Sequence, residues 1–226
     1  MFGIDLYNLL FAISIWAVPV VFAITLHEVA HGWAAKQLGD PTAFRLGRLS
    51  VNPIRHVDPI GTVIVPTGLA LLSSGAMMFG WAKPVPVVFG NLREPKRDMI
   101  LVALAGPGAN LVMAAFWALV AMLVFALGVA GSFAGGWLIL NSESGIKINV
   151  FLMVFNLLPI PPLDGGRVLA GLLPKAGSDF LARIEPFGFI IVLLLVFGFG
   201  GPLWAILEPF VRFFLDFFYS AAGLSL

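Results

Sequence analysis

Thr25-Leu26-His27-Glu28-Val29-Ala30-His31 lies inside an apolar run that extends from Leu6 to Leu38. On a helix, the spacing of four residues puts His27 and His31 on one face. There two imidazoles can bind one Zn²⁺, and Glu28 can reach a water molecule beside it. These three side chains are costly in an apolar segment unless they face protein, metal or trapped water, so the pattern predicts a functional site. The alternative is a chance motif whose histidines are satisfied within a helix bundle.

The composition is that of a membrane protein. The chain has 226 residues, of which 60% are hydrophobic and 11% charged, and its mean hydropathy is +1.00. Lysine and arginine are gathered in a few short connections, which argues against a nucleic-acid partner. The absence of cysteine excludes disulfides, thiolate catalysis and cysteine zinc sites, so a bound metal must be held by histidine and carboxylate.

The apolar runs predict about four membrane spans. A helix over Leu6–Leu38 would be roughly 50 Å long against a hydrocarbon thickness of about 30 Å, which places the motif near one membrane boundary. Because no basic segment precedes this run, we expect a retained first span and not a signal peptide. The other predicted spans are Met99 to about Val129, a third from Ile148, and Phe187 to about Leu207. After Pro209 we expect an amphipathic helix along the interface.

Two basic connections fix the predicted orientation. One contains Lys36, Arg45, Arg48 and Arg55, and the other extends from Lys83 to Arg97. By the positive-inside rule, both are cytoplasmic. The apolar stretch 59–81 between them must then cross the membrane an even number of times. This favours a re-entrant hairpin that lines the site, and a plain spanning helix is the alternative. The connection with Glu143 and Lys147 is expected outside.

The predicted fold class is therefore an all-α polytopic membrane protein, with about four full transmembrane helices and a re-entrant hairpin. Residues 1–226 are expected to form a single integral-membrane domain without internal repeats. We also expect a little β structure in the cytoplasmic-side loops. Val85–Phe89 and Leu49–Val51 are candidate edges that could hold an extended peptide, with ordinary loop packing as the alternative.

Asp164 is the predicted third metal ligand. A catalytic zinc needs three protein ligands and one open position. Of the twelve acidic residues, Glu28 and Asp164 are the two expected within apolar spans and away from basic loops, and Glu28 is assigned as the base. The third span contains three prolines and two glycines around Asp164, so its helix should break there, at the depth of His31.

These motifs together resemble the site-2 protease family of intramembrane zinc metalloproteases. The resemblance rests on His27-Glu28-x-x-His31 in a span, on Gly106-Pro107 opening the next span, and on Asn156-Leu157-Leu158-Pro159 leading to Leu163-Asp164-Gly165-Gly166-Arg167. It covers the three-span catalytic core. No inserted PDZ domain or carboxy-terminal CBS pair is seen, so the regulation of those subgroups does not carry over.

The resemblance implies both chemistry and site residues. His27, His31 and Asp164 would bind one zinc ion per chain, Glu28 would be the general base, and Asn156 would lie near the substrate. The expected activity is metalloendopeptidase cleavage of a transmembrane protein substrate in the lipid bilayer, near the cytoplasmic face, in regulated intramembrane proteolysis. For Asn156, the alternative is that its amide satisfies backbone freed by Pro159.

Two further questions stay open at the level of sequence. His56, the remaining histidine, could reach the metal, a water molecule or the substrate, or it could be a structural loop residue. The alternative functions are a membrane metal-ion transporter and an inactive membrane scaffold. Transporters commonly have internal repeats and polar residues at the midplane of several spans, which this sequence does not show.

Overall fold

The chain folds into helices joined by short loops. The computed structural model describes residues 6–65, 68, 80 and 82–225, and these contain no β-strand. The expected β structure is therefore not confirmed. In Val85–Phe89, the backbone N–H groups of Val85 and Val88 donate to carboxylates, so they are not available to a strand ladder. Most of the predicted hairpin lies outside the described residues; its beginning forms the π-helix η2 (Pro59–Ile64).

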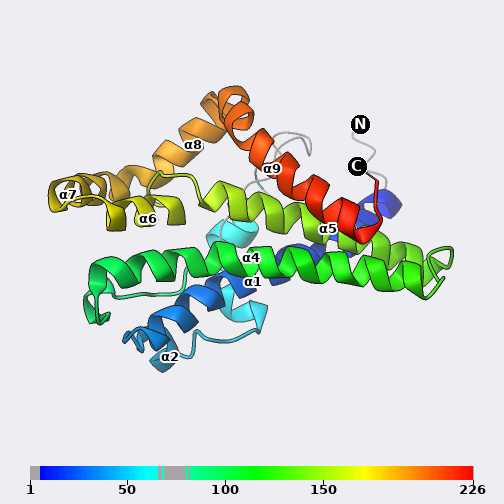
Figure 1. Cartoon of the computed structure of the whole chain (residues 1–226), viewed down its shortest axis with the longest axis horizontal. Helices are drawn as coiled ribbons and strands as arrows, with labels where there is room; N and C mark the ends of the chain where they lie inside the picture. The colour runs from blue at the N-terminus through cyan, green and yellow to red at the C-terminus, as the bar shows by residue number, and fades with distance from the viewer. Residues whose placement is uncertain (1–5, 66–67, 69–79, 81, 226) are drawn as a thin grey trace.

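Three long helices lie side by side and form the body of the molecule (Figure 1). They are α1 (Leu6–Gln37), α4 (Pro95–Ala126) and α5 (Phe133–Asn156). Among the described residues, four helical segments are long and apolar enough to cross a membrane: Leu10–Gln37, Pro95–Ala126, Phe133–Asn156 and Lys175–Gly198. The predicted number of spans is confirmed.

The boundaries of the third span correct the sequence prediction. The stretch that we expected as an outer connection is part of α5, which begins directly after Ser132, and Glu143 lies within this helix. The buried polar side chains Asn141 and Ser142 donate to carbonyls four residues earlier in the same helix. A helix that satisfies its polar groups internally can cross a membrane despite modest hydropathy.

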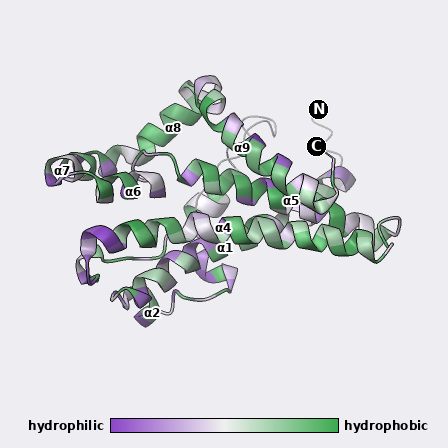
Figure 2. Ribbon diagram, viewed as in Figure 1, coloured by the Kyte–Doolittle hydropathy of each residue, from purple (hydrophilic) through white to green (hydrophobic). Residues whose placement is uncertain are grey.

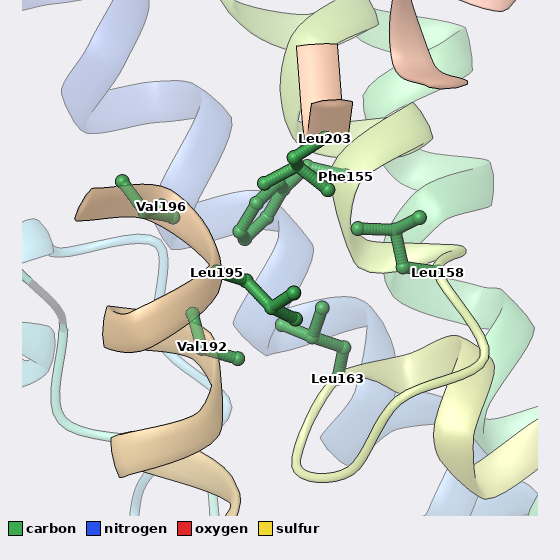
Figure 3. A pocket seen from close by; sticks show the side chains of 7 residues that line it. All are labelled: Phe155, Leu158, Leu163, Val192, Leu195, Val196 and Leu203. Atoms are coloured by element: carbon green, nitrogen blue, oxygen red, sulfur yellow. The ribbon is translucent and has the colours of Figure 1, made fainter. Parts of the chain in front are cut away.

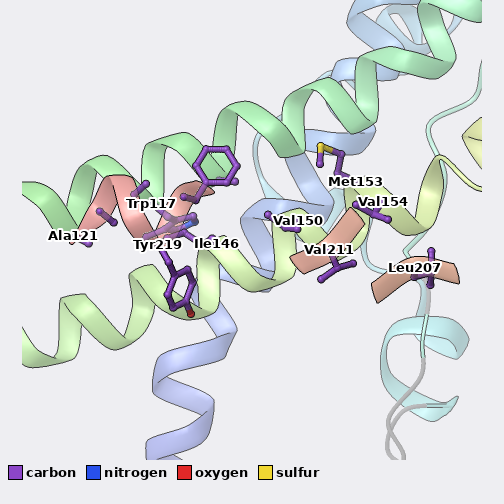
Figure 4. Packing of buried hydrophobic residues seen from close by; sticks show 13 residues of the cluster. Trp117, Ala121, Ile146, Val150, Met153, Val154, Leu207, Val211 and Tyr219 are labelled. Carbon is purple, nitrogen blue, oxygen red and sulfur yellow. The ribbon is translucent and has the colours of Figure 1, made fainter. Parts of the chain in front are cut away.

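The carboxy-terminal third also differs from its prediction. It contains α6 (Asp164–Leu172), α7 (Lys175–Ile184), α8 (Gly188–Gly198) and α9 (Gly200–Ala222). The expected span from Phe187 to Leu207 is interrupted at Phe199, where glycines weaken the helix on both sides. Helix α9 continues through Pro209, so no separate tail begins there. Its buried face packs on α4 and α5 in the main apolar core, with Trp117, Ile146 and Val150 (Figure 4).

Polar residues are concentrated at one end of the molecule, around α2 (Thr42–Arg45), the beginning of α4, and α7 (Figure 2). Helix α1 ends there, followed by Gly39 in a left-handed conformation with φ of +116°. The short helices η1 (Pro53–His56), η3 (Phe89–Asn91) and η4 (Glu185–Phe187) complete the connections. Helices α1 and α6 both pack against α4.

Helix α8 covers the loop that joins α5 to α6. An apolar pocket lies between them, lined by Phe155, Leu158, Leu163, Val192, Leu195, Val196 and Leu203 (Figure 3). No polar side chain lines this pocket. Its apolar side chains hold the loop in place, and the pocket itself has no chemical role. Leu163, in this lining, directly precedes Asp164.

Candidate metal centre

Three metal-binding side chains meet where α1 and α6 approach each other. The Nε2 atoms of His27 and His31 lie 3.2 and 3.3 Å from Asp164 Oδ2, and 3.0 Å from each other. All three side chains are buried. Among the described residues, this is the group of histidine and acidic side chains whose spacing suits a single metal ion.

The opposite nitrogen of each imidazole is held by a partner on α4. His27 Nδ1 lies 2.6 Å from Asn110 Oδ1, and His31 Nδ1 lies 2.7 Å from the Val102 carbonyl oxygen. The carbonyl can only accept a hydrogen bond, so His31 Nδ1 must carry a proton. Asn110 uses its Nδ2 to donate to the Ala23 carbonyl, which leaves its Oδ1 to accept from His27. When the two rings are neutral, both Nε2 atoms therefore carry the lone pair and face Asp164.

This arrangement fits a bound cation. With neutral rings, two imidazole lone pairs and a carboxylate oxygen converge on one buried point, and Asp164 Oδ2 has no hydrogen-bond donor among the described residues apart from these two rings. Three such acceptors repel one another unless a positive charge, either a metal ion or a proton, lies between them. Neutral imidazole and carboxylate are the ligand types that zinc accepts, and each imidazole has the outer hydrogen-bond partner typical of metal-binding histidines.

Glycines make room for these side chains. A Cβ on Gly106 would lie 2.3 Å from His31 Nε2 and 2.7 Å from His27 Cε1, so α4 can approach the imidazoles only with glycine there. A Cβ on Gly165 would lie 2.2 Å from the Leu157 carbonyl oxygen. The proline-rich loop can therefore fold back against the start of α6, where it positions Asp164.

Glu28 is held by the segment that follows the undescribed residues. Its Oε2 accepts a hydrogen bond of 2.7 Å from the Val85 backbone N–H. Three residues later, the Val88 N–H donates to Asp40 Oδ2, also at 2.7 Å. Two carboxylates thus fasten one short segment beside the end of α1.

Asp40 is itself tightly bound. Its buried carboxylate also accepts hydrogen bonds from the Thr42 backbone N–H and hydroxyl and from Asn91 Nδ2. Burial alone would raise the pKa of the Asp40 carboxyl, but the hydrogen bonds favour its ionised form, and the pKa is lowered on balance.

The remaining predicted site residues lie outside this group. Asn156, at the end of α5, is partly buried, and its Nδ2 donates to the Leu152 carbonyl at 2.9 Å. His56 is buried in η1, and its Nε2 lies 2.8 Å from the Ser50 carbonyl oxygen. This contact supports the structural alternative for His56.

Sequence reasoning did not find the residues around the imidazoles. It used Gly106 only as part of the motif that opens the second span and assigned no role to Asn110 or Val102; a backbone carbonyl such as that of Val102 has no sequence signal. Asn110 did carry a signal, since an amide in an apolar helix must find a partner when it is buried.

Comparison with known proteins identifies relatives over most of the chain. The model of peptidase family M50 matches residues 142–199. YwhC of Bacillus subtilis, named as a zinc metalloprotease, is 38% identical over 180 residues, which cover 79% of this chain and 78% of YwhC. Rip2 of Mycolicibacterium smegmatis, also so named, is 31% identical over 207 residues, covering 87% of this chain and 71% of Rip2. MJ0611 of Methanocaldococcus jannaschii, with the same designation, is 30% identical over 162 residues, or 71% of each chain. No solved structure shows a significant match.

Proposed function

Because this chain belongs to peptidase family M50, the zinc-dependent site-2 protease family, we propose that it hydrolyses peptide bonds of membrane-embedded proteins near the cytoplasmic face. The family and the apolar helices establish a membrane zinc metalloprotease. The intramembrane substrate, the side of the membrane and the individual residue roles are our proposal.

The observation that carries the proposal is the convergence of His27, His31 and Asp164. We assign these three residues as the side chains that would hold zinc, which is the number of protein ligands that a catalytic zinc site uses. Glu28 directly follows the first ligand and is partly exposed, unlike the ligands. This placement supports its assignment as the general base.

Glu28 moves the proton in the proposed reaction. When bound, zinc acts as a Lewis acid that polarises a carbonyl group and lowers the pKa of a water molecule to about 7. Glu28 accepts the proton of the attacking water and delivers it to the departing amine nitrogen. The Val85 N–H fixes one carboxylate oxygen, and we assign proton transfer to the other.

Asn156 is proposed to bind the substrate. Its amide nitrogen has two hydrogens, and the Leu152 carbonyl uses one of them. The second can donate to a substrate carbonyl or to the oxyanion that develops during hydrolysis. For His56 we propose a structural role in the loop before η2.

The distribution of charge supports a cytoplasmic position of the site. The end of α1 that carries His31 adjoins α2, which ends at Arg45 and is followed by Arg48. Lys96 and Arg97 lie in the first turn of α4, near the same end (Figures 1 and 2). By the positive-inside rule, this end faces the cytoplasm.

The experiment compares cells that contain the active enzyme with cells that contain Glu28→Gln. We expect fragments of single-pass membrane proteins that appear only with the active enzyme, while purified Glu28→Gln retains its zinc. Glu143→Gln removes a carboxylate from a spanning helix away from the site and is the matched control, which should cleave normally. Equal fragments with Glu28→Gln would refute the protease assignment, because transport or scaffolding does not need this proton acceptor.

A further inference from the structure

A chain of amide hydrogen bonds connects the metal centre to the third spanning helix. Asn110 Nδ2 donates to Asn149 Oδ1 at 2.9 Å, and Asn149 Nδ2 donates to the Gly145 carbonyl at 2.8 Å. Both amides are completely buried. Together with the bond to His27, these contacts link α1, α4 and α5 in one line.

The Gly145 carbonyl fixes the donor and acceptor roles along this series of hydrogen bonds. The Gly145 carbonyl can only accept, so Asn149 must turn its nitrogen toward Gly145 and its oxygen toward Asn110. Asn110 must then donate to Asn149 with its nitrogen and accept from His27 with its oxygen. His27 must in turn carry its proton on Nδ1, which leaves Nε2 free to bind a metal.

We propose that Asn149, which touches neither metal nor substrate, is a positioning residue for the metal centre and sets the tautomer and orientation of His27 through Asn110. The proposal rests on the assignment of His27 as a zinc ligand. It does not extend to His31, whose Nδ1 is held independently by the Val102 carbonyl.

The expected effect is moderate because Asn110 has a second anchor. Its Nδ2 also donates to the Ala23 carbonyl, at 3.2 Å, so loss of Asn149 weakens the orientation of the amide without abolishing it. Loss of an outer hydrogen-bond partner commonly lowers metal affinity by 10- to 100-fold, and we expect a value at the lower end, about tenfold.

Asn141 offers a matched control on the same helix. It is also buried and also donates to the carbonyl four residues earlier, that of Trp137. Its Oδ1, however, receives no hydrogen bond from the described part of the chain. Asn141→Leu therefore removes the same local interaction from α5 without touching the path to His27.

The first experiment measures zinc affinity of the full-length protein in detergent, by competition with a chromophoric chelator. We expect Asn149→Leu to bind zinc about tenfold more weakly, and Asn141→Leu to bind like the unmodified protein. Equal affinities for Asn149→Leu and Asn141→Leu would overturn the positioning role. His27→Ala tests the assignment of His27 as a zinc ligand, on which the role of Asn149 rests. Unchanged zinc binding in this variant would refute that assignment, and not only the role of Asn149.

The second experiment makes its decisive measurement on the unmodified protein. The ¹⁵N chemical shifts of the imidazoles in the zinc-free, unmodified protein report which nitrogen carries the proton, and three histidines can be assigned by single substitution. We expect the Nδ1–H tautomer for His27. A predominant Nε2–H tautomer would overturn the inference. In Asn149→Leu, the signals of His27 should change while those of His31 stay in place.

Discussion

Replacing Gly106 by alanine should disable the metal centre while leaving helix α4 intact. The added Cβ would lie 2.3 Å from His31 Nε2 and 2.7 Å from His27 Cε1, whereas ordinary contacts begin at 3.4 Å. The imidazoles or the helix must therefore move by roughly 1 Å, and a displacement of this size at a reacting centre can cost about 100-fold in rate. We expect a similar order of loss in cleavage and weaker zinc binding.

Gly108→Ala is the control for this substitution. It lies two residues further along the same helix, and its Cβ would meet no atom within 4 Å. Alanine is favoured over glycine in a helix interior by about 1 kcal/mol, so neither change should unfold α4 through propensity. The assay compares retained zinc and the Glu28-dependent membrane-protein fragments in both variants. Normal zinc binding and cleavage by Gly106→Ala would refute the close approach of α4 to the imidazoles.

Three further predictions concern the surroundings of the site. The lowered pKa of Asp40 means that its ionised form stabilises the fold, fully so above its unfolded-state pKa of about 3.9, and that this contribution is lost as the pH falls through the folded-state pKa. Thermal unfolding of the unmodified protein should therefore lose stability below about pH 4 more steeply than that of Asp40→Asn, and parallel curves would contradict this. Gly165→Ala should lower zinc retention, because its Cβ meets the rigid Leu157 carbonyl; the check is metal content after dialysis, with Gly108→Ala again as the control. His56→Ala should keep zinc and cleavage while losing about 1 kcal/mol of stability with its hydrogen bond, and a selective loss of cleavage would instead give His56 a part in substrate binding.

The sequence predicted those features that have a local signature. The first helix was expected over Leu6–Leu38 and is found over Leu6–Gln37, because one apolar run ends at Gly39. The meeting of Asp164 with the histidines followed from the spacing of His27 and His31 and from the helix break expected at the prolines. The first argument uses one apolar run, and the second uses local motifs in two spans that were expected to end at the same depth.

Features that depend on partners from other helices were not predictable. The start of α5 was missed because Asn141 and Ser142 look unsuited to a span until their hydrogen bonds to the helix backbone are known. The hydrogen bond from the Val85 backbone N–H to Glu28 joins residues 57 positions apart. Any residue except proline could supply this N–H, so the sequence gives no signal for it. Such features depend on contacts between segments that are far apart in the sequence.

The proposed ligands come from distant parts of the chain, the histidines from α1 and the carboxylate from the start of α6. During synthesis, more than half of the residues of the protein are added after His31 before the ribosome reaches Asp164. A nascent or truncated product that ends before Asp164 therefore lacks one of the three proposed ligands. On the proposed ligand assignment, the centre is complete only after α6 has been synthesised and has packed beside α1, so the order of the sequence delays hydrolytic competence.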